Sequence, residues 1–326
     1  MYRELLILCM GDVSLDDVQE WLNTHEGNLD LLRNATDHRD DNNRTPLHWL
    51  VSSQPPSDLV ERFLQLAPHT VSVSSVEGHL PLHNACLNYA SSDVIKSLLE
   101  AYPEAVEVQD REGWLPLHIA CARGASLDVI KMLLQPYPEA AKIQNTYGDL
   151  PIHYACHSCC TNAPKVVMLL LEKYPKAVEV KNKDGFLPLH AACKLNDVNV
   201  IRILLEAYPE AVTIQDHDGH LPIHLACINK ASTEVIKMLM NDNQGLGKVL
   251  ESHFEAMLTD IKGKIGQLED KNQKTTNEFR EELGKVKSDI THMMELQVGM
   301  KTDLTRLYDM INDVRTRMVY WRSLSK

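Results

Sequence analysis

The chain has 326 residues, of which 44% are hydrophobic and 24% charged, a composition typical of globular proteins long enough for about two domains. Its acidic charge is concentrated in residues 1–245. The last 81 residues hold 14 Lys plus Arg and 13 Asp plus Glu, and subtraction from the totals of 33 and 45 leaves 19 and 32, a net of −13. This charge disfavours nucleic acid as a partner, because phosphate binding depends on Lys and Arg, and it favours basic or neutral protein surfaces.

The sequence predicts neither a membrane span nor a secretion signal. The longest aliphatic run, at 166–171, is far shorter than the roughly 20 residues that span a bilayer. The apolar run at 5–8 is too short for a signal peptide and is followed closely by Asp12, Asp16 and Asp17. We therefore expect a soluble cytoplasmic protein without membrane association, and a nuclear location is also compatible with the sequence.

The first 39 residues are predicted to form a degenerate capping repeat. Their Ser14-Leu15-Asp16-Asp17-Val18 is similar to Ser126-Leu127-Asp128-Val129 further along the chain. A stack of repeats needs such a segment, because its outermost repeat would otherwise expose apolar surface.

Residues 40–245 contain six repeats. Histidines recur there at intervals of 35, 35, 35, 37 and 34 residues, at His48, His83, His118, His153, His190 and His224. Similar words surround each of them, such as Leu80-Pro81-Leu82-His83-Asn84-Ala85-Cys86. A period in this range predicts a solenoid, in which each unit is too small to bury a core alone and stacks on its neighbours.

Each repeat is predicted to contain two helices. In the second repeat, Pro81 suits the first position of a helix, which we expect to end near Tyr89. Ser91 or Ser92 then caps a second helix, which ends before Pro103. Words of the Tyr-Pro-Glu-Ala type close four of the units, at 102–106, 137–141, 174–178 and 208–212.

These words resemble the ankyrin repeat. Asp110-x-x-Gly113-x-Leu115-Pro116-Leu117-His118-x-Ala120-Cys121 is similar to the family pattern D-x-x-G-x-T-P-L-H-x-A-A. The resemblance covers about residues 5–245 and implies an all-α solenoid of paired antiparallel helices. The threonine of the pattern survives only as Thr45, and leucine replaces it elsewhere, so the usual hydroxyl bond to the histidine is absent from five repeats (Leu80, Leu115, Leu150, Leu187 and Leu221).

The recurring histidines and cysteines are expected to serve the fold. Each histidine should bond the backbone of an adjacent loop, and the cysteine that recurs in five repeats suits a reduced core thiol. No catalytic motif is present, so we expect neither an enzyme nor a cofactor. An expanded turn adds His157, Cys159 and Cys160 after Cys156 in a loosely zinc-like spacing. We expect no metal there, and redox activity of Cys159 and Cys160 is left open.

The resemblance implies a binding surface made of loop tips and the exposed side of the first helices. Trp114 and Phe186, which precede Leu-Pro words, are the predicted anchors, because aromatic residues dominate many interface energies. The alternative is that each packs against a neighbouring loop. The remaining candidates are polar or amphipathic: His79, His220, Tyr147, Arg111, Glu112 and Arg123.

Residues 246–326 are predicted to form a long coiled-coil helix. Apolar residues there alternate spacings of three and four. A single apolar stripe of this length needs a partner, so we predict a parallel homodimer through residues 250–322, with antiparallel, trimeric and heteromeric assemblies left open. The seam includes Ile261, Ile265, Leu268, Asn272, Ile290, Leu304, Leu307 and Ile311.

Together these features predict a non-catalytic interaction scaffold that binds an unidentified protein partner and dimerises through its tail. One alternative is a substrate-recognition adaptor whose coiled coil docks onto the catalytic subunit of an enzyme complex. A second is a scaffold held at a membrane surface by the basic carboxyl-terminal tip around Trp321.

Overall fold

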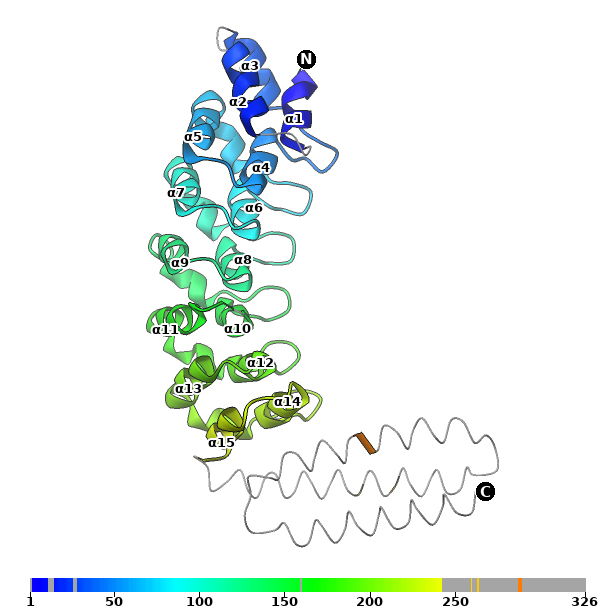
Figure 1. The fold of residues 1–326 in the computed structure, drawn as a ribbon, viewed down its shortest axis with the longest axis vertical. Helices are drawn as coiled ribbons and strands as arrows, with labels where there is room; N and C mark the ends of the chain where they lie inside the picture. Colours follow the sequence, from blue (N-terminus) through cyan, green and yellow to red (C-terminus); the bar gives the residue numbers. More distant parts are fainter. Residues whose placement is uncertain are drawn as a thin grey trace, which may run out of the picture. The chain divides into compact units, whose positions relative to one another are not determined.

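The computed structural model describes residues 2–10, 15–25, 28–158 and 160–241, with the single residues 259, 263, 287 and 288. Every regular element in these ranges is helical, so the all-α prediction is confirmed (Figure 1). The described residues fall into two units that divide between Leu221 and Pro222. None of the described helices is long and apolar enough to cross a membrane.

The predicted coiled coil, residues 246–326, lies outside the described ranges apart from those single residues. The same is true of Cys159 and of every predicted seam residue: Ile261, Ile265, Leu268, Asn272, Ile290, Leu304, Leu307 and Ile311.

The amino-terminal segment forms three short helices. One face of α1 buries Leu5 and Leu6, and one face of α2 buries Trp21 and Leu22. The first of these helices contacts both α3 and the first helix of the first repeat. The segment thus has one helix more than a repeat pair: α1 (Tyr2–Met10), α2 (Leu15–Thr24) and α3 (Leu29–Thr36).

The first helix of each repeat in the first unit begins at the proline of its Leu-Pro or Thr-Pro word. Proline suits this position because the N–H that it lacks would have no helical partner there. The predicted end near Tyr89 lies two residues too far, because Tyr89 adopts a positive φ of 59°. The five helices are α4 (Pro46–Leu50, followed by η1, Val51–Ser53), α6 (Pro81–Leu87), α8 (Pro116–Arg123), α10 (Pro151–Cys156) and α12 (Pro188–Leu195).

The second helices run antiparallel to the first and bury an apolar stripe between repeats (Figure 1). In the second repeat Ser91 Oγ accepts a hydrogen bond from Val94 N (3.3 Å), so Ser91 is the cap, and Ile95 and Leu98 are fully buried. The helices of this set are α5 (Ser57–Leu66), α7 (Ser92–Ala101), α9 (Leu127–Leu134), α11 (Ala163–Lys173) and α13 (Val198–Ala207).

A short 3₁₀ turn follows each second helix of the first unit. In the second repeat Tyr102 leaves helical geometry at φ −149°, Pro103 begins the turn, and Ala105 and Val106 point into the core. The Tyr-Pro-Glu-Ala type motifs, which the sequence analysis identifies as helix ends, therefore also begin a new element. These turns are η2 (Pro68–Ser72), η3 (Pro103–Glu107), η4 (Pro138–Lys142), η5 (Pro175–Glu179) and η6 (Pro209–Thr213).

The recurring histidines join consecutive repeats, as predicted. In the third repeat His118 Nδ1 accepts a hydrogen bond from Leu115 N (3.1 Å), and Nε2 lies 3.2 Å from the carbonyl oxygen of Asp149 in the next loop. The Nε2 atoms of His48, His83, His153 and His190 make the same contact at 3.1–3.3 Å. Where leucine replaces threonine, the backbone N–H bond to Nδ1 remains and only the hydroxyl contact seen in the first repeat is absent, Thr45 Oγ1 to His48 Nδ1 at 2.9 Å.

The recurring cysteines are buried in the repeat core, as predicted, and none of the described cysteines is in a disulfide. Burial raises the pKa of the Cys86 thiol to about 12 and raises that of Cys121 and Cys156 further. These thiols therefore stay protonated at neutral pH.

The described residues of the second unit form one further helix pair, which carries the helical words of the sixth repeat. Ser232 Oγ accepts a hydrogen bond from Val235 N (3.3 Å) ahead of the second helix. The two helices contact each other: α14 (Pro222–Ile228) and α15 (Thr233–Asn241).

Candidate partner-binding surface

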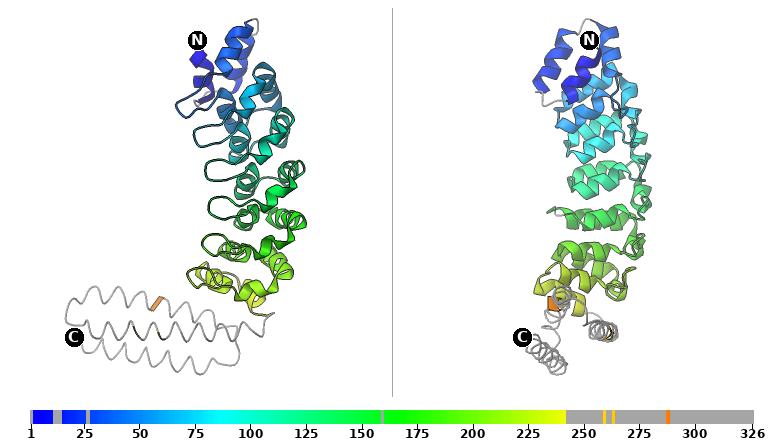
Figure 2. Two further views of the ribbon diagram at one scale, coloured as in Figure 1. Left: turned by 180° about the vertical axis from the view of Figure 1, so that it is seen from behind. Right: turned by 90° about the vertical axis from the view of Figure 1, so that its right-hand side faces the viewer.

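The loops between repeats are held in a row by backbone hydrogen bonds. In the third repeat's loop, Asp110 Oδ1 accepts hydrogen bonds from Glu112 N (2.9 Å) and Trp114 N (2.8 Å), and Gly113 turns the chain at φ 77°. Arg111 N donates to Glu77 O of the preceding loop (2.9 Å). Thr146, Lys183 and His217 continue this series with donor to acceptor distances of 2.8–2.9 Å. We call the series the loop ladder; it fixes the tips side by side along one edge of the repeats (Figure 2).

Trp114 is half-buried at the base of the loop ladder and does not project freely. Its ring centroid lies 4.3 Å from that of Tyr154 in the next repeat. The indole Nε1 is buried and has no hydrogen-bond partner among the described residues. Of the two possibilities left open by the sequence, packing against the neighbouring repeat therefore describes Trp114.

Tyr154 anchors a polar network behind the Trp114 ring. Its hydroxyl donates to Asp149 Oδ2 (3.0 Å) and accepts from Asn145 Nδ2 (2.8 Å). Asn182 Nδ2 from the following repeat donates to the other oxygen of Asp149 (2.8 Å). Burial, followed by the charge of Asp149, raises the pKa of Tyr154 well above its usual value, so the phenol stays neutral.

Phe186 is also half-buried, but against its own repeat. Its ring stacks on His190 with centroids 5.7 Å apart, and Lys194 Nζ lies 4.1 Å from the ring centroid. Both predicted anchors are therefore covered on one side by residues of the repeats, Trp114 by the next repeat and Phe186 by its own.

Each of the two candidate histidines lies beside a carboxylate, which belongs to the next loop for His79 and to the same loop for His220. His79 Nε2 lies 3.1 Å from Asp110 Oδ2, and its ring stacks on His83 with centroids 5.6 Å apart. His220, four repeats beyond His79, has its Nδ1 3.4 Å from Asp216 Oδ2. The structure therefore brings His79 near Trp114 but places His220 in a different part of the ladder.

The remaining candidates are exposed. Arg111 and Glu112 lie at one loop tip, and Tyr147, which is 49% exposed, lies at the next. The negative charge of Glu112 is the main cause that raises the pKa of the Tyr147 hydroxyl, so these two side chains are close. Arg123 lies at the far end of α8, where its Nε donates to Leu87 O (2.9 Å).

Two tyrosines that make ring contacts near this surface, Tyr89 and Tyr154, were not predicted from the sequence. Tyr89 is 55% exposed at the end of α6, with the Arg123 guanidinium 4.7 Å from its ring centroid, and Leu87 beside it is 37% exposed. Tyr154 follows its histidine directly, at a position that carries Asn84, Ile119 or Ala191 in other repeats. The first repeat has Trp49 and the sixth has Leu225 at this position, so the size of the side chain alone did not single out Tyr154.

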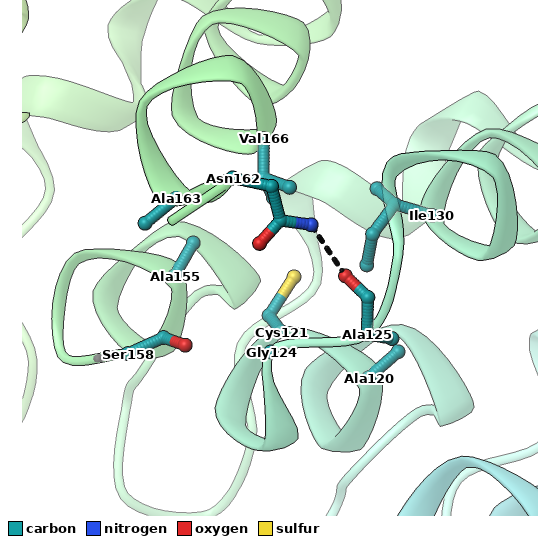
Figure 3. Close-up of a pocket in the computed structure, with 10 residues that line it drawn as sticks. All are labelled: Ala120, Cys121, Gly124, Ala125, Ile130, Ala155, Ser158, Asn162, Ala163 and Val166. Atoms are coloured by element: carbon teal, nitrogen blue, oxygen red, sulfur yellow. Dashed lines mark hydrogen bonds between the residues drawn. The ribbon is translucent and has the colours of Figure 1, made fainter. Parts of the chain in front are cut away.

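A small cavity lies between the third and fourth repeats (Figure 3). Its volume is about 10 Å³, which is no more than one water molecule needs, and it lies where the expanded turn after Cys156 meets the end of α8 at Gly124. Asn162 Nδ2 donates to Ala125 O across it (2.8 Å), while Cys160 packs over Gly124. Small and apolar side chains form most of the wall, and no group of three or more His, Cys, Asp or Glu within the described ranges is placed to hold a metal ion.

The family model for ankyrin repeats (3 copies) matches residues 82–181 and again residues 157–248, together just over half of the chain. The search of curated protein sequences found no match to this chain. Among solved structures the chain is similar to the ankyrin repeat domain of Bcl-3, described as a unique member of the IkappaB protein family. That comparison has a TM-score of 0.52 and 19% sequence identity and covers 73% of this chain and 97% of that one. At this identity the likeness concerns the fold. The family model matches the residues that form repeats in the structure, and the chain belongs to the ankyrin-repeat family.

Proposed function

We propose that this chain is a non-catalytic interaction protein whose repeats bind a protein partner through one defined surface. Ankyrin repeats are in general protein-interaction modules. The surface comprises the tips and first-helix ends of the second to fourth repeats, namely Leu87, Tyr89, Arg111, Glu112, Trp114, Arg123 and Tyr147, and we call it the aromatic face.

Tyr89 is the observation that carries this proposal. A bulky side chain seldom adopts a positive φ, and a residue held there costs on the order of 1 kcal/mol or more. Tyr89 does so at 59° while leaving 55% of its surface exposed. The same position, six residues after the recurring histidine, has a positive φ at Gln54, Gly124 and Asn196, so the end of the first helix imposes it. In the second repeat this geometry holds a large aromatic ring at the surface. An exposed tyrosine with a guanidinium over its ring is also the side-chain chemistry that interface anchors favour.

The test is proximity labelling in cells with the full chain and with Tyr89→Asn. Asparagine tolerates positive φ, so this variant removes the ring while preserving the turn. We expect one set of neighbouring proteins to fall at least about fivefold, since losing an interface anchor costs about 1 kcal/mol or more. Trp114→Ala should remove the same set.

Met168→Ala is the matched control, because Met168 is 58% exposed but lies on α11, a second helix away from the aromatic face. It should leave the labelled neighbours unchanged. Identical neighbours for all four chains would contradict the proposal.

We further propose the roles of the segments on either side of the repeats. Residues 1–39 cap the array of residues 40–245, and residues 246–326 form a coiled coil that pairs two chains through residues 250–322. Pairing would let two aromatic faces engage one target and raise apparent affinity without new contacts. We also propose a cytoplasmic place of action, which the free, buried cysteines of the described repeats support.

A further inference from the structure

Four tyrosines recur at the ends of the second helices, on elements separate from the aromatic face. Three of them directly follow the last residue of their helix, and Tyr137 lies three residues after the end of α9. Each is half-buried and is followed by an exposed proline that begins a 3₁₀ turn. We call this set the Tyr-Pro strip: Tyr102-Pro103, Tyr137-Pro138, Tyr174-Pro175 and Tyr208-Pro209.

The tyrosine hydroxyls of the strip are available to a ligand. None of the four makes a hydrogen bond within the described chain, and none is among the buried polar atoms that lack a partner. Each tyrosine is thus half-buried in its repeat, and its hydroxyl is neither fully enclosed nor bonded there. The first repeat has Ala67 at the equivalent position, so the strip starts at the second repeat.

The four tyrosines occupy equivalent places in consecutive repeats. The backbone angles of the four tyrosines are nearly identical, with φ between −139° and −150°. The helices that precede them, α7, α9, α11 and α13, contact one another in that order (Figure 1). Packed helices lie about 8–10 Å apart, and from this we infer a row of tyrosines at about that interval.

The charge beside the strip is negative. The four segments that begin at these tyrosines, 102–108, 137–143, 174–180 and 208–214, contain five glutamates and two lysines, a net of −3. Lys142 Nζ is paired with Glu139 at 2.7 Å. The other glutamates have no ion pair within the described residues: Glu104, Glu107, Glu179 and Glu210.

We propose that the Tyr-Pro strip binds a basic, proline-rich segment of a protein in the polyproline II conformation. That helix has three residues per turn and a rise of about 3.1 Å, so it presents the same face every 9.3 Å or so, which matches the spacing of the tyrosines. An α-helix repeats at about 5.4 Å, and one face of a β-strand repeats at about 6.8 Å, so neither stays in register with the row. Polyproline II carbonyls have no internal partners and can accept the four hydroxyls, while aromatic grooves accommodate the proline rings.

The experiment is a fluorescence-anisotropy titration of the full chain against a labelled peptide of four Pro-Pro-Lys units. This peptide spans about 34 Å in the polyproline II form, which covers the three intervals between the tyrosines. Two peptides of equal length serve as ligand controls, one of Ala-Ala-Lys units and one of Pro-Pro-Glu units. We expect saturable binding of the Pro-Pro-Lys peptide that is at least tenfold tighter than that of either control.

Conservative variants test the assignment to the strip. Tyr137→Phe combined with Tyr174→Phe keeps both rings and removes two hydroxyls, and we expect affinity to fall about fivefold or more. Glu104→Lys combined with Glu210→Lys should weaken binding further and reduce its salt dependence. Tyr89→Asn should have no effect, which separates the strip from the aromatic face.

Three results would overturn the inference. The first is that the Pro-Pro-Lys peptide does not bind. The second is that the Ala-Ala-Lys peptide binds equally well, which would indicate charge attraction alone. The third is that the paired Tyr→Phe variant, with native circular dichroism, has unchanged affinity. Loss of binding in Tyr89→Asn alone would assign the peptide to the aromatic face.

Discussion

At the scale of single residues, the buried histidines depend on one protonation state. Nδ1 accepts a hydrogen bond from a backbone N–H, so the proton resides on Nε2, which donates to the next loop. Protonation of Nδ1 would set two N–H groups against each other. Burial is the largest cause that lowers the pKa of His48, His83, His118 and His190 to about 4, and it lowers that of His153 as well.

We predict that the fold loses stability in acid because of these histidines. Their pKa is lower in the folded chain than the ordinary value of 6.5, so the stability that they contribute is fully present above pH 6.5 and is lost as pH falls towards 4. Between these limits each histidine lowers the free energy of unfolding by on the order of 1.4 kcal/mol for each unit that the pH falls. Urea unfolding followed by circular dichroism should show a midpoint that drops steeply from pH 7 to pH 5. His118→Gln should show a shallower slope, and a midpoint constant over this range would contradict the assignment.

The sequence predicted these histidine contacts because six copies at one position leave little other explanation. It did not predict Tyr89 or Tyr154 as contact residues. Their exposure and ring contacts depend on where α6 ends and on how close the next repeat lies, and neither is encoded in the residue itself.

At the scale of elements, the loop ladder requires glycine at one position. Gly113 has φ 77°, and a Cβ there would lie 3.0 Å from Thr146 N and 3.1 Å from Asn145 Cα in the next loop. The glycine therefore permits both the turn and the close approach of the two loops. The family pattern contains this glycine, but the sequence alone does not show that its neighbour is backbone.

Gly113→Ala should therefore destabilise the fold by about 1–3 kcal/mol, from backbone strain and the displaced loop. The measurement is the free energy of unfolding in urea. Glu112→Ala in the same loop is the control and should change stability by less than about 0.5 kcal/mol, because its side chain is exposed. Equal stability of both variants and the unmodified chain would show that the loops are not held as the ladder implies.

The 3₁₀ turns mark a limit of prediction at this scale. A proline after Tyr102 identifies the end of a helix, but whether the chain then extends or turns depends on the space that Ala105 and Val106 find in the core. The helix starts were easier to predict, because a proline at the first position is favoured by local geometry alone.

At the scale of the whole molecule, the change of sequence pattern near residue 246 leads us to predict a dimer. Sedimentation equilibrium of the full chain should give twice the mass of one chain. Leu304→Asp combined with Leu307→Asp places charges in the predicted seam and should return the mass to that of one chain. Lys301→Asp, a charge change outside the seam, is the control. A single-chain mass for the unmodified protein would contradict the dimer.

The buried cysteines give the array a set of internal reporters. Cys86, Cys121, Cys156 and Cys193 lie in successive repeats, and each is inaccessible in the folded chain. An alkylating reagent requires an exposed thiolate, so it reaches each of them only when that repeat opens. The natural sequence thus allows the free energy of opening to be read repeat by repeat from labelling rates, without any introduced probe.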